Sequence, residues 1–282
     1  MTLEHNRLLK VPVQYLANDE NLAIYVASVG GGEIPQHEGN YEMRTVIMTD
    51  GRNHDSLFNL DRHGFKLVKH CSLVSDFDDG DQVTSVYETE IKDLVKAETG
   101  AIEVIVFDHT RRAASEQVRK QKMVREPAST IHNDYTAWSG PNRLREIFRE
   151  RRLELEELAD HRFAIVNIWR SAAGTIENYP LAMCDASSTV PVDLVSVKRQ
   201  ANDRIGEIQL ATYNPKHRWF YFPHMAMDEA LLFKTYDSAE DGRARFTIHT
   251  SFDDPTAPSD APVRQSIETR CFAFFQERKV DA

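Results

Sequence analysis

RFAIVNIWR, at residues 162–170, is the first of five short segments that are rich in aromatic and β-branched residues. The other four are EIQLATYN (207–214), RWFYFP (218–223), RARFTIHTSF (243–252) and SIETRCFAFF (266–275), and Gly, Pro, Asn and Asp occur between them. Residues of the first kind favour strands, and residues of the second kind favour turns. Many short strands at fairly regular spacing predict an antiparallel barrel or jelly roll rather than a doubly wound α/β fold.

Helices are expected mainly before and between these strands. Residues 88–95 carry apolar side chains at helical spacing, and Gly100 follows as a C-cap. Two basic helices come next, one after the N-cap Ser115 and one over residues 141–158. The second has interleaved Arg and Glu, which predicts a solvated face, and one apolar stripe. The stripe consists of Leu144, Ile147, Phe148, Leu155 and Leu158. One short helix is expected to interrupt the later strands at residues 227–236.

No linker composition marks a domain boundary. The first hundred residues read as short strands separated by turns, and the chain has no Pro- or Ser-rich tract. We therefore expect one domain over residues 1–282, mainly β with flanking helices. Residues 1–115 would extend the sheets of a core at about 125–276. No GxGxxG or GxxxxGKS/T motif follows a predicted strand, and this argues against a phosphate-binding loop.

The overall composition excludes several classes of protein. The 282 residues include 34 Lys and Arg against 44 Asp and Glu, a net charge of −10. An acidic chain without a long basic run is not expected to bind nucleic acid. No segment has the ~18 apolar residues of a membrane span, and the N-terminal residues are too polar for a signal peptide. Cys71, Cys184 and Cys271 are far apart and form no CxxC pair, so we expect no disulfide framework and a cytoplasmic location.

His132 and Asp134 are two positions apart on a segment that reads as extended, so their side chains point to the same side. Iron(II) oxygenases combine such a pair with a second histidine and leave one face of the ion open for cosubstrate and oxygen. Taken alone, a His and an Asp at this spacing more often make a surface hydrogen bond. Three later histidines are candidates for the remaining ligand: His217, His224 and His249. His249 is favoured because it ends the alternating run RARFTIHTSF.

A second pair with the same spacing comes fifteen residues after His249. Arg264 and Ser266 open the last predicted strand, where a guanidinium fork and a hydroxyl can hold a carboxylate such as the distal one of 2-oxoglutarate. In the alternative, Arg264 pairs with Glu268 or another acid and Ser266 only ends a turn. Arg170 and Arg270 compete as anchors. Arg270 would lie about 20 Å further along the strand at ~3.3 Å per residue, too far to share the same carboxylate.

Long segments of the chain carry a family resemblance. They are TGAIEVIVFDHTRR, IHNDYT, the pair NIWR and YPLAMCD, HRWFYFPHMAMDEALLFKTYDS, RFTIHTSFDDP and RQSIETRCFAFF, spread over about residues 40–276. In these segments the chain resembles the oxidoreductase family that groups fungal gibberellin desaturase, the small component of bacterial cephamycin methoxylation and the fungal endoperoxidase of meroterpenoid biosynthesis. One departure is Ser171, which follows Arg170 where the family usually has Pro, and it bears on the local loop and the substrate.

The resemblance implies a non-haem iron, 2-oxoglutarate-dependent oxygenase with a double-stranded β-helix core. Its cofactors would be Fe(II), 2-oxoglutarate as cosubstrate, and O2. It assigns the metal ligands to His132, Asp134 and His249, and the 2-oxoglutarate anchor to Arg264 and Ser266. The implied substrate is a small natural product or metabolite. Hydroxylation, desaturation, ring closure and endoperoxide formation all remain open as outcomes.

Other residues are candidates for supporting roles. Tyr135, Asn167 and Arg170 are candidate substrate contacts or supports of the metal ligands. Arg170 on a buried strand needs a charged partner, which would be a bound carboxylate or an acid such as Asp185. An aromatic stripe is predicted to be core rather than a ligand cage, and it consists of Trp219, Tyr221, Phe222 and Met225.

Two hypotheses from other classes accompany the oxygenase. The first is a non-catalytic partner subunit of a biosynthetic enzyme, but such a subunit has no need of several polar groups converging inside a barrel. The second is a zinc-dependent hydrolase, which would give Arg264 no role. Self-association into a homo-oligomer stays open.

Overall fold

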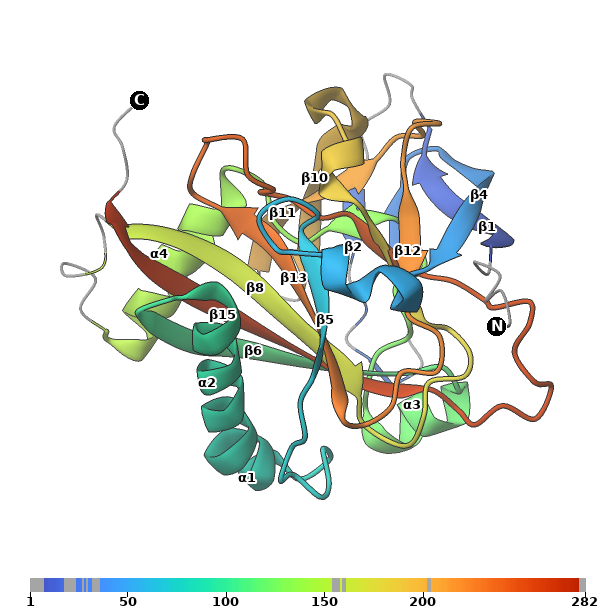
Figure 1. Cartoon of the computed structure of the whole chain (residues 1–282), viewed down its shortest axis with the longest axis horizontal. Helices are drawn as coiled ribbons and strands as arrows, with labels where there is room; N and C mark the ends of the chain where they lie inside the picture. Colours follow the sequence, from blue (N-terminus) through green and yellow to red (C-terminus); the bar gives the residue numbers. More distant parts are fainter. Residues whose placement is uncertain are drawn as a thin grey trace.

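The chain forms two curved β-sheets flanked by helices (Figure 1). The computed structural model describes residues 8–17, 24–26, 28, 30–31, 36–153, 158, 161–201 and 204–278. Within these residues, the larger sheet has ten strands. Their order is β1 (Leu8–Leu16), β4 (Tyr41–Asp50), β12 (Trp219–Tyr221), β9 (Leu181–Cys184), β14 (His249–Ser251), β7 (His132–Asn133), β11 (Arg204–Ala211), β10 (Leu194–Ala201), β2 (Ile24–Val26) and β3 (Gln36–Glu38).

The second sheet has five strands among the described residues, all paired antiparallel. Their order is β5 (Phe65–Lys69), β13 (Glu229–Asp237), β8 (His161–Ser171), β15 (Gln265–Arg278) and β6 (Glu103–Ala113). The helices are α1 (Gly80–Gln82), α2 (Glu88–Thr99), α3 (Glu116–Lys122) and α4 (Ser139–Arg151), with a π-turn at Val83–Tyr87 and 3-10 turns at Arg52–Leu57, Ala186–Ser188 and Pro191–Asp193. None of the described helices is long and apolar enough to span a membrane.

The inner faces of the two sheets share a core. Phe65, Trp169 and Phe233 of the five-stranded sheet pack in one cluster with Leu181 and Met183 of β9. The predicted aromatic stripe of residues 219–225 is buried in this cluster and in the neighbouring one beneath β1 and β4, which confirms it as core. Short, mostly antiparallel strands in two packed sheets confirm the predicted mainly β fold with a double-stranded β-helix core.

α2 covers the outer face of the five-stranded sheet. Its apolar face packs in one cluster with Val166 and Ile168 of β8. The helix ends where Gly100 adopts a left-handed φ of 73°, and the N–H of Gly100 donates to the carbonyl of Lys96. Both the predicted helix and its C-cap are therefore confirmed.

α4 is shorter than the predicted helix over residues 141–158. It spans Ser139–Arg151 and ends at Arg152, which has a left-handed φ of 53°. The helix packs on the face of β8 and β15 opposite to α2. Of the predicted stripe, Leu144, Ile147 and Phe148 are buried, Leu158 is partly buried, and Leu155 lies outside the described residues.

The helix predicted over residues 227–236 is wrong, because this segment is the strand β13. Every residue of β13 is buried, since one face of the strand packs in the cluster beneath α2 and the other in the core between the sheets. A strand covered on both faces is a continuous apolar run, and such a run has no period that distinguishes it from a buried helix. Glu229, expected in a helix start, instead accepts two hydrogen bonds from the Arg52 guanidinium.

Two shorter predictions have different outcomes. Ser115 caps α3 as predicted, since its hydroxyl accepts a hydrogen bond from the backbone N–H of Val118. Residues 243–252 form a strand only at His249–Ser251. Within this segment, Arg245 donates to the carbonyl of Asp237 and to Glu240. The first half of the segment is therefore held by contacts to the preceding turn and does not pair with a strand.

The first 115 residues contribute strands to both sheets. β1, β2, β3 and β4 belong to the ten-stranded sheet, and β5 and β6 form the two edges of the five-stranded sheet. β6 pairs with β15 along ten residue pairs, from Gln265↔Ala113 to Phe274↔Glu103. The N-terminal segment is thus built into the same sheets as the strands that follow residue 125.

Candidate functional site

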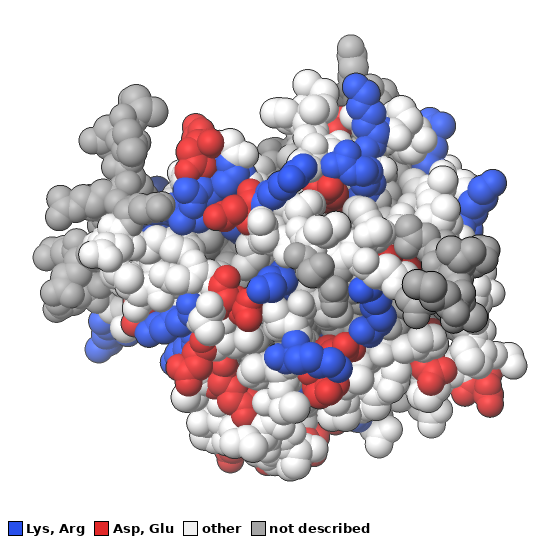
Figure 2. Space-filling view, in the orientation of Figure 1, with Lys and Arg blue, Asp and Glu red and all other residues white. Residues whose placement is uncertain are grey.

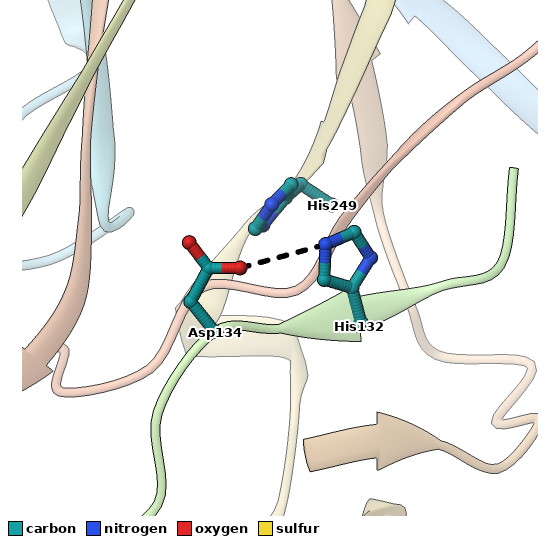
Figure 3. A group of neighbouring side chains, drawn as sticks. All are labelled: His132, Asp134 and His249. Atoms are coloured by element: carbon teal, nitrogen blue, oxygen red, sulfur yellow. Dashed lines mark ion pairs between the residues drawn. The ribbon is translucent and has the colours of Figure 1, made fainter. Parts of the chain in front are cut away.

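Strand pairing brings His132, Asp134 and His249 together (Figure 3). His132 on β7 pairs with His249 on β14, and Asp134 directly follows β7. His132 Nε2 lies 3.6 Å from Asp134 Oδ1, and one candidate ligand atom from each residue lies within 4.8 Å of the others. Ligand atoms at about 2.1 Å from one ion are about 3–3.5 Å apart, so small side-chain shifts would let the three groups share a metal.

Both imidazole rings are held in the orientation that a metal ligand needs. His132 Nδ1 lies 2.8 Å from the carbonyl oxygen of Thr130, and His249 Nδ1 lies 3.0 Å from that of Thr247. A carbonyl only accepts, so each Nδ1 carries the proton and each Nε2 presents a lone pair. His249 Nε2 is buried without a partner among the described residues. Burial and the neighbouring His249 lower the pKa of His132 to about 4, and burial also lowers the pKa of His249, so both rings are neutral, as ligands must be.

Asp134 is held through one of its two carboxylate oxygens. Its Oδ2 accepts from Arg270 Nε at 2.8 Å and from Asn167 Nδ2 at 2.8 Å, which leaves Oδ1 on the side of His132. Burial acts to raise the pKa of Asp134, but the charge of Arg270 outweighs it and keeps that pKa well below its usual range. The carboxylate is therefore ionised and oriented to bind through a single oxygen.

Arg270 extends this support into a network of acids. Its guanidinium also contacts Asp108 Oδ2 at 2.7 Å and Glu268 Oε1 at 2.6 Å. Asn167 Nδ2 donates to the same Glu268 oxygen at 2.7 Å. The sequence reasoning treated Arg270 only as a competing carboxylate anchor and missed this role. The available signal was that a buried arginine on the inner face of a strand requires acidic partners.

Arg264 and Ser266 form a buried site in which the guanidinium has no acidic partner. Arg264 donates to Ser266 Oγ at 3.0 Å, to Ser251 Oγ at 2.9 Å and to the Tyr179 carbonyl at 2.9 Å. Its guanidinium carbon lies 5.1 Å from the centre of the Trp169 ring. No carboxylate among the described residues pairs with Arg264, and its Nε has no partner there.

The electrostatics of Arg264 reflect this missing acid. Burial, together with the positive charge of Arg112, lowers the pKa of Arg264 to about 9. The alternative partner Glu268 bonds instead to Arg270 and Asn167. A buried cation with only neutral hydrogen-bond partners is suited to receive a carboxylate.

A pocket of about 460 Å³ adjoins the His/Asp/His cluster and is lined by His132, Asp134 and Tyr135. Its volume is in the range of small-molecule sites. Arg264 and Ser266 are not among its lining residues. Its larger apolar side chains are Tyr25, Phe107, Met123, Val124, Tyr135 and Ile208, and its arginines are Arg111, Arg112, Arg125, Arg143, Arg199 and Arg270.

The structure does not bring Arg170 to this site. β8 alternates, so Asn167 and Trp169 face the barrel interior whereas Arg170 faces the α2 side, where its guanidinium lies near the rings of Phe77 and Tyr87. Arg170 contacts His70 Nδ1 at 3.1 Å and donates to the carbonyls of His70 and Met227. The suggested partner Asp185 instead pairs with Arg218 at 2.7 Å.

The two other candidate histidines also lie outside the cluster. His217 Nε2 is 3.1 Å from Asp193 Oδ2, and its Nδ1 is 3.1 Å from the Tyr15 hydroxyl. His224 is exposed and has a left-handed φ of 52°. Sequence reasoning also missed Arg112, Arg125 and Arg199 of the pocket, because they come from segments that only the sheet pairing brings together.

Comparisons with known proteins find relatives along most of the chain. The model of the family described as "Oxidoreductase/YMDC permease-like domain" matches residues 13–274. The hydroxylase/desaturase CTB9 of Cercospora beticola is 32% identical over 276 residues, which cover 90% of this chain and 83% of that protein. The Fe(II)/2-oxoglutarate-dependent dioxygenase nvfI of Aspergillus novofumigatus is 30% identical over 83% of this chain and 84% of its own.

A solved structure gives the same result at the level of the fold. The iron and alpha-ketoglutarate-dependent endoperoxidase NvfI superposes with a TM-score of 0.82 at 25% sequence identity, over 96% of this chain and 99% of its own. The agreement extends over nearly the whole length of both chains.

Proposed function

The chain belongs to the Oxidoreductase/YMDC permease-like family, here represented by Fe(II)/2-oxoglutarate-dependent oxygenases, and we propose that His132, Asp134 and His249 are its iron ligands. The chain is an oxygenase that requires Fe(II), 2-oxoglutarate and O2 and acts on a small molecule in natural-product biosynthesis. The observation that carries the ligand assignment is the convergence of two neutral imidazoles and one ionised carboxylate. In each group, the atom that would not bind the metal (Nδ1 of the histidines, Oδ2 of Asp134) makes a hydrogen bond that orients the side chain. Two histidines and one carboxylate are the ligand set of non-haem Fe(II) oxygenases.

The far carboxylate of 2-oxoglutarate is assigned to Arg264 and Ser266. Arg264 supplies the only charge in that site among the described residues. Its hydrogen bonds to Ser266 and Ser251 orient the guanidinium. Bound iron and 2-oxoglutarate supply the oxidising chemistry, in which the cosubstrate loses CO2 to become succinate as O2 is reduced. The chain's own contribution is to hold the metal ligands, to orient the cosubstrate and to place the substrate in the pocket beside His132.

A zinc hydrolase accounts for less of the structure. It would use the same three ligands, but it leaves the buried Arg264 without a carboxylate to bind. The same buried cation argues against a non-catalytic subunit, since a scaffold gains nothing from an unneutralised guanidinium.

The ligand assignment is tested by iron content and by succinate formation from 2-oxoglutarate, measured with Fe(II) and ascorbate in the absence of substrate. His132→Ala, Asp134→Ala and His249→Ala should each lose bound iron and succinate formation. His224→Ala is the matched control, because it removes an exposed imidazole. Wild-type iron content and succinate formation in His249→Ala would refute the assignment.

The domain organisation and the surroundings of the protein are proposed on separate grounds. One domain over residues 1–282 is supported by the strands that the first 115 residues add to both sheets. No nucleic-acid partner is proposed, since basic and acidic side chains are interspersed on the face in Figure 2 and the net charge is −10. A cytoplasmic location is supported by three cysteines that are all free.

A further inference from the structure

The pocket beside the proposed iron ligands is lined in part by arginines that form no ion pair with an acid among the described residues. Six arginines and four carboxylates line it. Three of the arginines have acidic partners: Arg111 with Asp78 at 2.6 Å, Arg143 with Glu146 at 3.2 Å, and Arg270 with Asp134, Asp108 and Glu268. The other three are Arg112, Arg125 and Arg199, here called the arginine cluster.

No carboxylate among the described residues forms an ion pair with the arginine cluster. Arg112 donates to the backbone carbonyl of Glu126 at 2.8 Å. The carboxylate of Glu126 accepts instead from the hydroxyl of Ser28, at 2.9 and 3.1 Å. Burial lowers the pKa of Arg125, and the charges of Arg112 and Arg199 lower it further. The three cations therefore lie close enough to repel one another in a partly desolvated place. Asp108 and Asp134 offset part of this repulsion without forming ion pairs with the cluster, and a bound anion would lower the free energy of the arrangement further.

Three different segments supply these side chains. Arg112 is near the end of β6, and the chain at Arg125 runs beside it in a parallel bridge. Arg199 lies on β10, where it is paired with Tyr25 of β2 on one side and with Gly206 of β11 on the other. Paired residues point to the same face of a sheet. The side chains of Tyr25 and Arg199 therefore lie next to each other on one face, and Gly206 leaves a gap on the other side of Arg199.

Gly206 leaves space beside Arg199. A Cβ atom added at Gly206 would have no heavy atom within 4 Å, and Gly206 lines the pocket. The pocket is thus open beside the guanidinium of Arg199, and Tyr25 provides an aromatic surface on the other side of it. The place is suited to a flat or apolar body that carries an anionic group.

Neither iron nor 2-oxoglutarate supplies the missing anion. The two positive charges of Fe(II) would be matched by Asp134 and by the other carboxylate of 2-oxoglutarate, and Arg270 keeps Asp108 and Glu268 as partners. The far carboxylate of the cosubstrate is assigned to Arg264, which does not line this pocket. The charge on the arginine cluster remains for a third molecule, the substrate.

We propose that the arginine cluster binds a carboxylate of the organic substrate, and that the apolar body of the substrate lies against Tyr25, Phe107 and Tyr135, near His132. This inference rests on the proposed function, because it takes the molecule in the pocket to be the one oxidised. Arg125 and Arg199 are the specificity-determining residues, since a guanidinium fork matches a planar carboxylate and an ester or amide would leave both charges unpaired. The enzyme therefore acts on an acid and discriminates against its neutral derivatives.

The test uses 2-naphthoate and its methyl ester as probes. Binding is measured by titration calorimetry on the Fe(II)- and 2-oxoglutarate-loaded enzyme without oxygen. We expect naphthoate to bind at least about tenfold more tightly than the ester, and Arg125→Gln or Arg199→Gln each to weaken naphthoate about 10- to 100-fold while leaving the ester unchanged. Arg218→Gln is the matched control, since its charge is paired with Asp185 and it does not line the pocket. Gly206→Leu should weaken both probes, because it fills the pocket without removing a charge.

Equal binding of the acid and the ester would overturn the inference, as would wild-type naphthoate binding in both glutamine variants or no naphthoate binding at millimolar concentration. Succinate formation without substrate is measured in the same variants. Arg125→Gln and Arg199→Gln should keep the wild-type requirement for 2-oxoglutarate, and an increase in it would reassign the cluster to the cosubstrate and overturn the inference. If the wild-type enzyme formed no succinate but still preferred naphthoate to its ester, the oxygenase function would fail and the carboxylate pocket would stand.

Discussion

Two groups of charged side chains in this protein, one buried and one partly buried, have opposite balances. At the end of β13, Asp237 accepts from Arg162 at 2.7 Å and from Lys234 at 2.8 Å, and Lys234 also contacts Asp61 at 2.6 Å. The arginine cluster of the pocket has three cations and no carboxylate partner among the described residues. In the first group the cations and carboxylates neutralise one another, so the group stabilises the fold. We infer that the second group is completed by a bound molecule, so that the balance of charge distinguishes a structural group from a binding group.

The largest effect is expected from breaking the balanced group. Asp237→Ala would leave Arg162 and Lys234 buried without their shared counter-charge, and the free energy of unfolding should fall by about 3–5 kcal/mol. Urea denaturation measures this change. Lys120→Ala is a useful control, since it breaks an exposed ion pair with Glu116 and should cost under about 1 kcal/mol. A loss below about 1 kcal/mol in Asp237→Ala would remove the structural half of the comparison.

The next effect concerns Arg264, a single buried cation with neutral partners. Arg264→Ala should raise the concentration of 2-oxoglutarate needed for half-maximal succinate formation by roughly two to three decades, because the bound carboxylate loses its counter-charge. Arg264→Lys should recover only part of this loss, since an ammonium cannot reproduce the planar fork. Arg170→Ala is the control, because Arg170 faces α2. A selective shift in Arg170→Ala with Arg264→Ala unchanged would contradict the assignment.

Arg270 lies between the two cases, since it is balanced by acids but belongs to the site. Arg270→Met should weaken iron binding about 10- to 100-fold, because Asp134 would lose the donor that fixes its Oδ2. Unlike Arg264→Ala, it should act on the metal before the cosubstrate. Iron titration followed by 2-oxoglutarate titration of the iron-saturated variant separates these effects. Unchanged iron affinity would show that Asn167 alone orients the carboxylate.

The smallest expected effect is a change in the free energy of unfolding at the arginine cluster, and its direction is informative. Arg125→Gln removes one of three mutually repelling charges and no ion pair, so in the absence of ligand the free energy of unfolding should stay within about 0.5 kcal/mol of wild type or rise. The same urea titration used for Asp237→Ala measures it. A clear destabilisation would mean that the arginine cluster stabilises the fold and is not held in excess for a ligand.

The parts of the site that sequence could predict are those set by local spacing. His132 and Asp134, and likewise Arg264 and Ser266, lie two residues apart on extended segments, so their shared orientation follows from the strand period alone. β8 and β15 were predictable for a related reason, because their aromatic and β-branched residues are bounded by turn residues. β13 was not, since it lacks alternation and, unlike β8, begins with Glu, Ala and Leu residues that favour a helix.

Features that depend on pairing between distant segments could not be predicted in this way. Arg199 enters the pocket because β10 pairs with β2 and β11, and Arg125 does so because its segment runs beside β6. The contact between Arg270 and Asp134 joins residues 136 positions apart. In each case the charge is visible in the sequence, whereas its partner, or the lack of one, is fixed only by the topology of the sheets.

The inward-facing positions on and before β15 also limit how the chain can change in length. Arg264, Ser266, Glu268 and Arg270 alternate with outward residues such as Ile267 and Cys271, which pack beneath α2. An insertion or deletion of one residue between Ser266 and Arg270 would turn one end of this series to the wrong face, so that the cosubstrate anchor or the support of Asp134 would be lost. Length variation among homologues is therefore expected in the exposed loop at residues 255–263 and excluded from the segment that follows it.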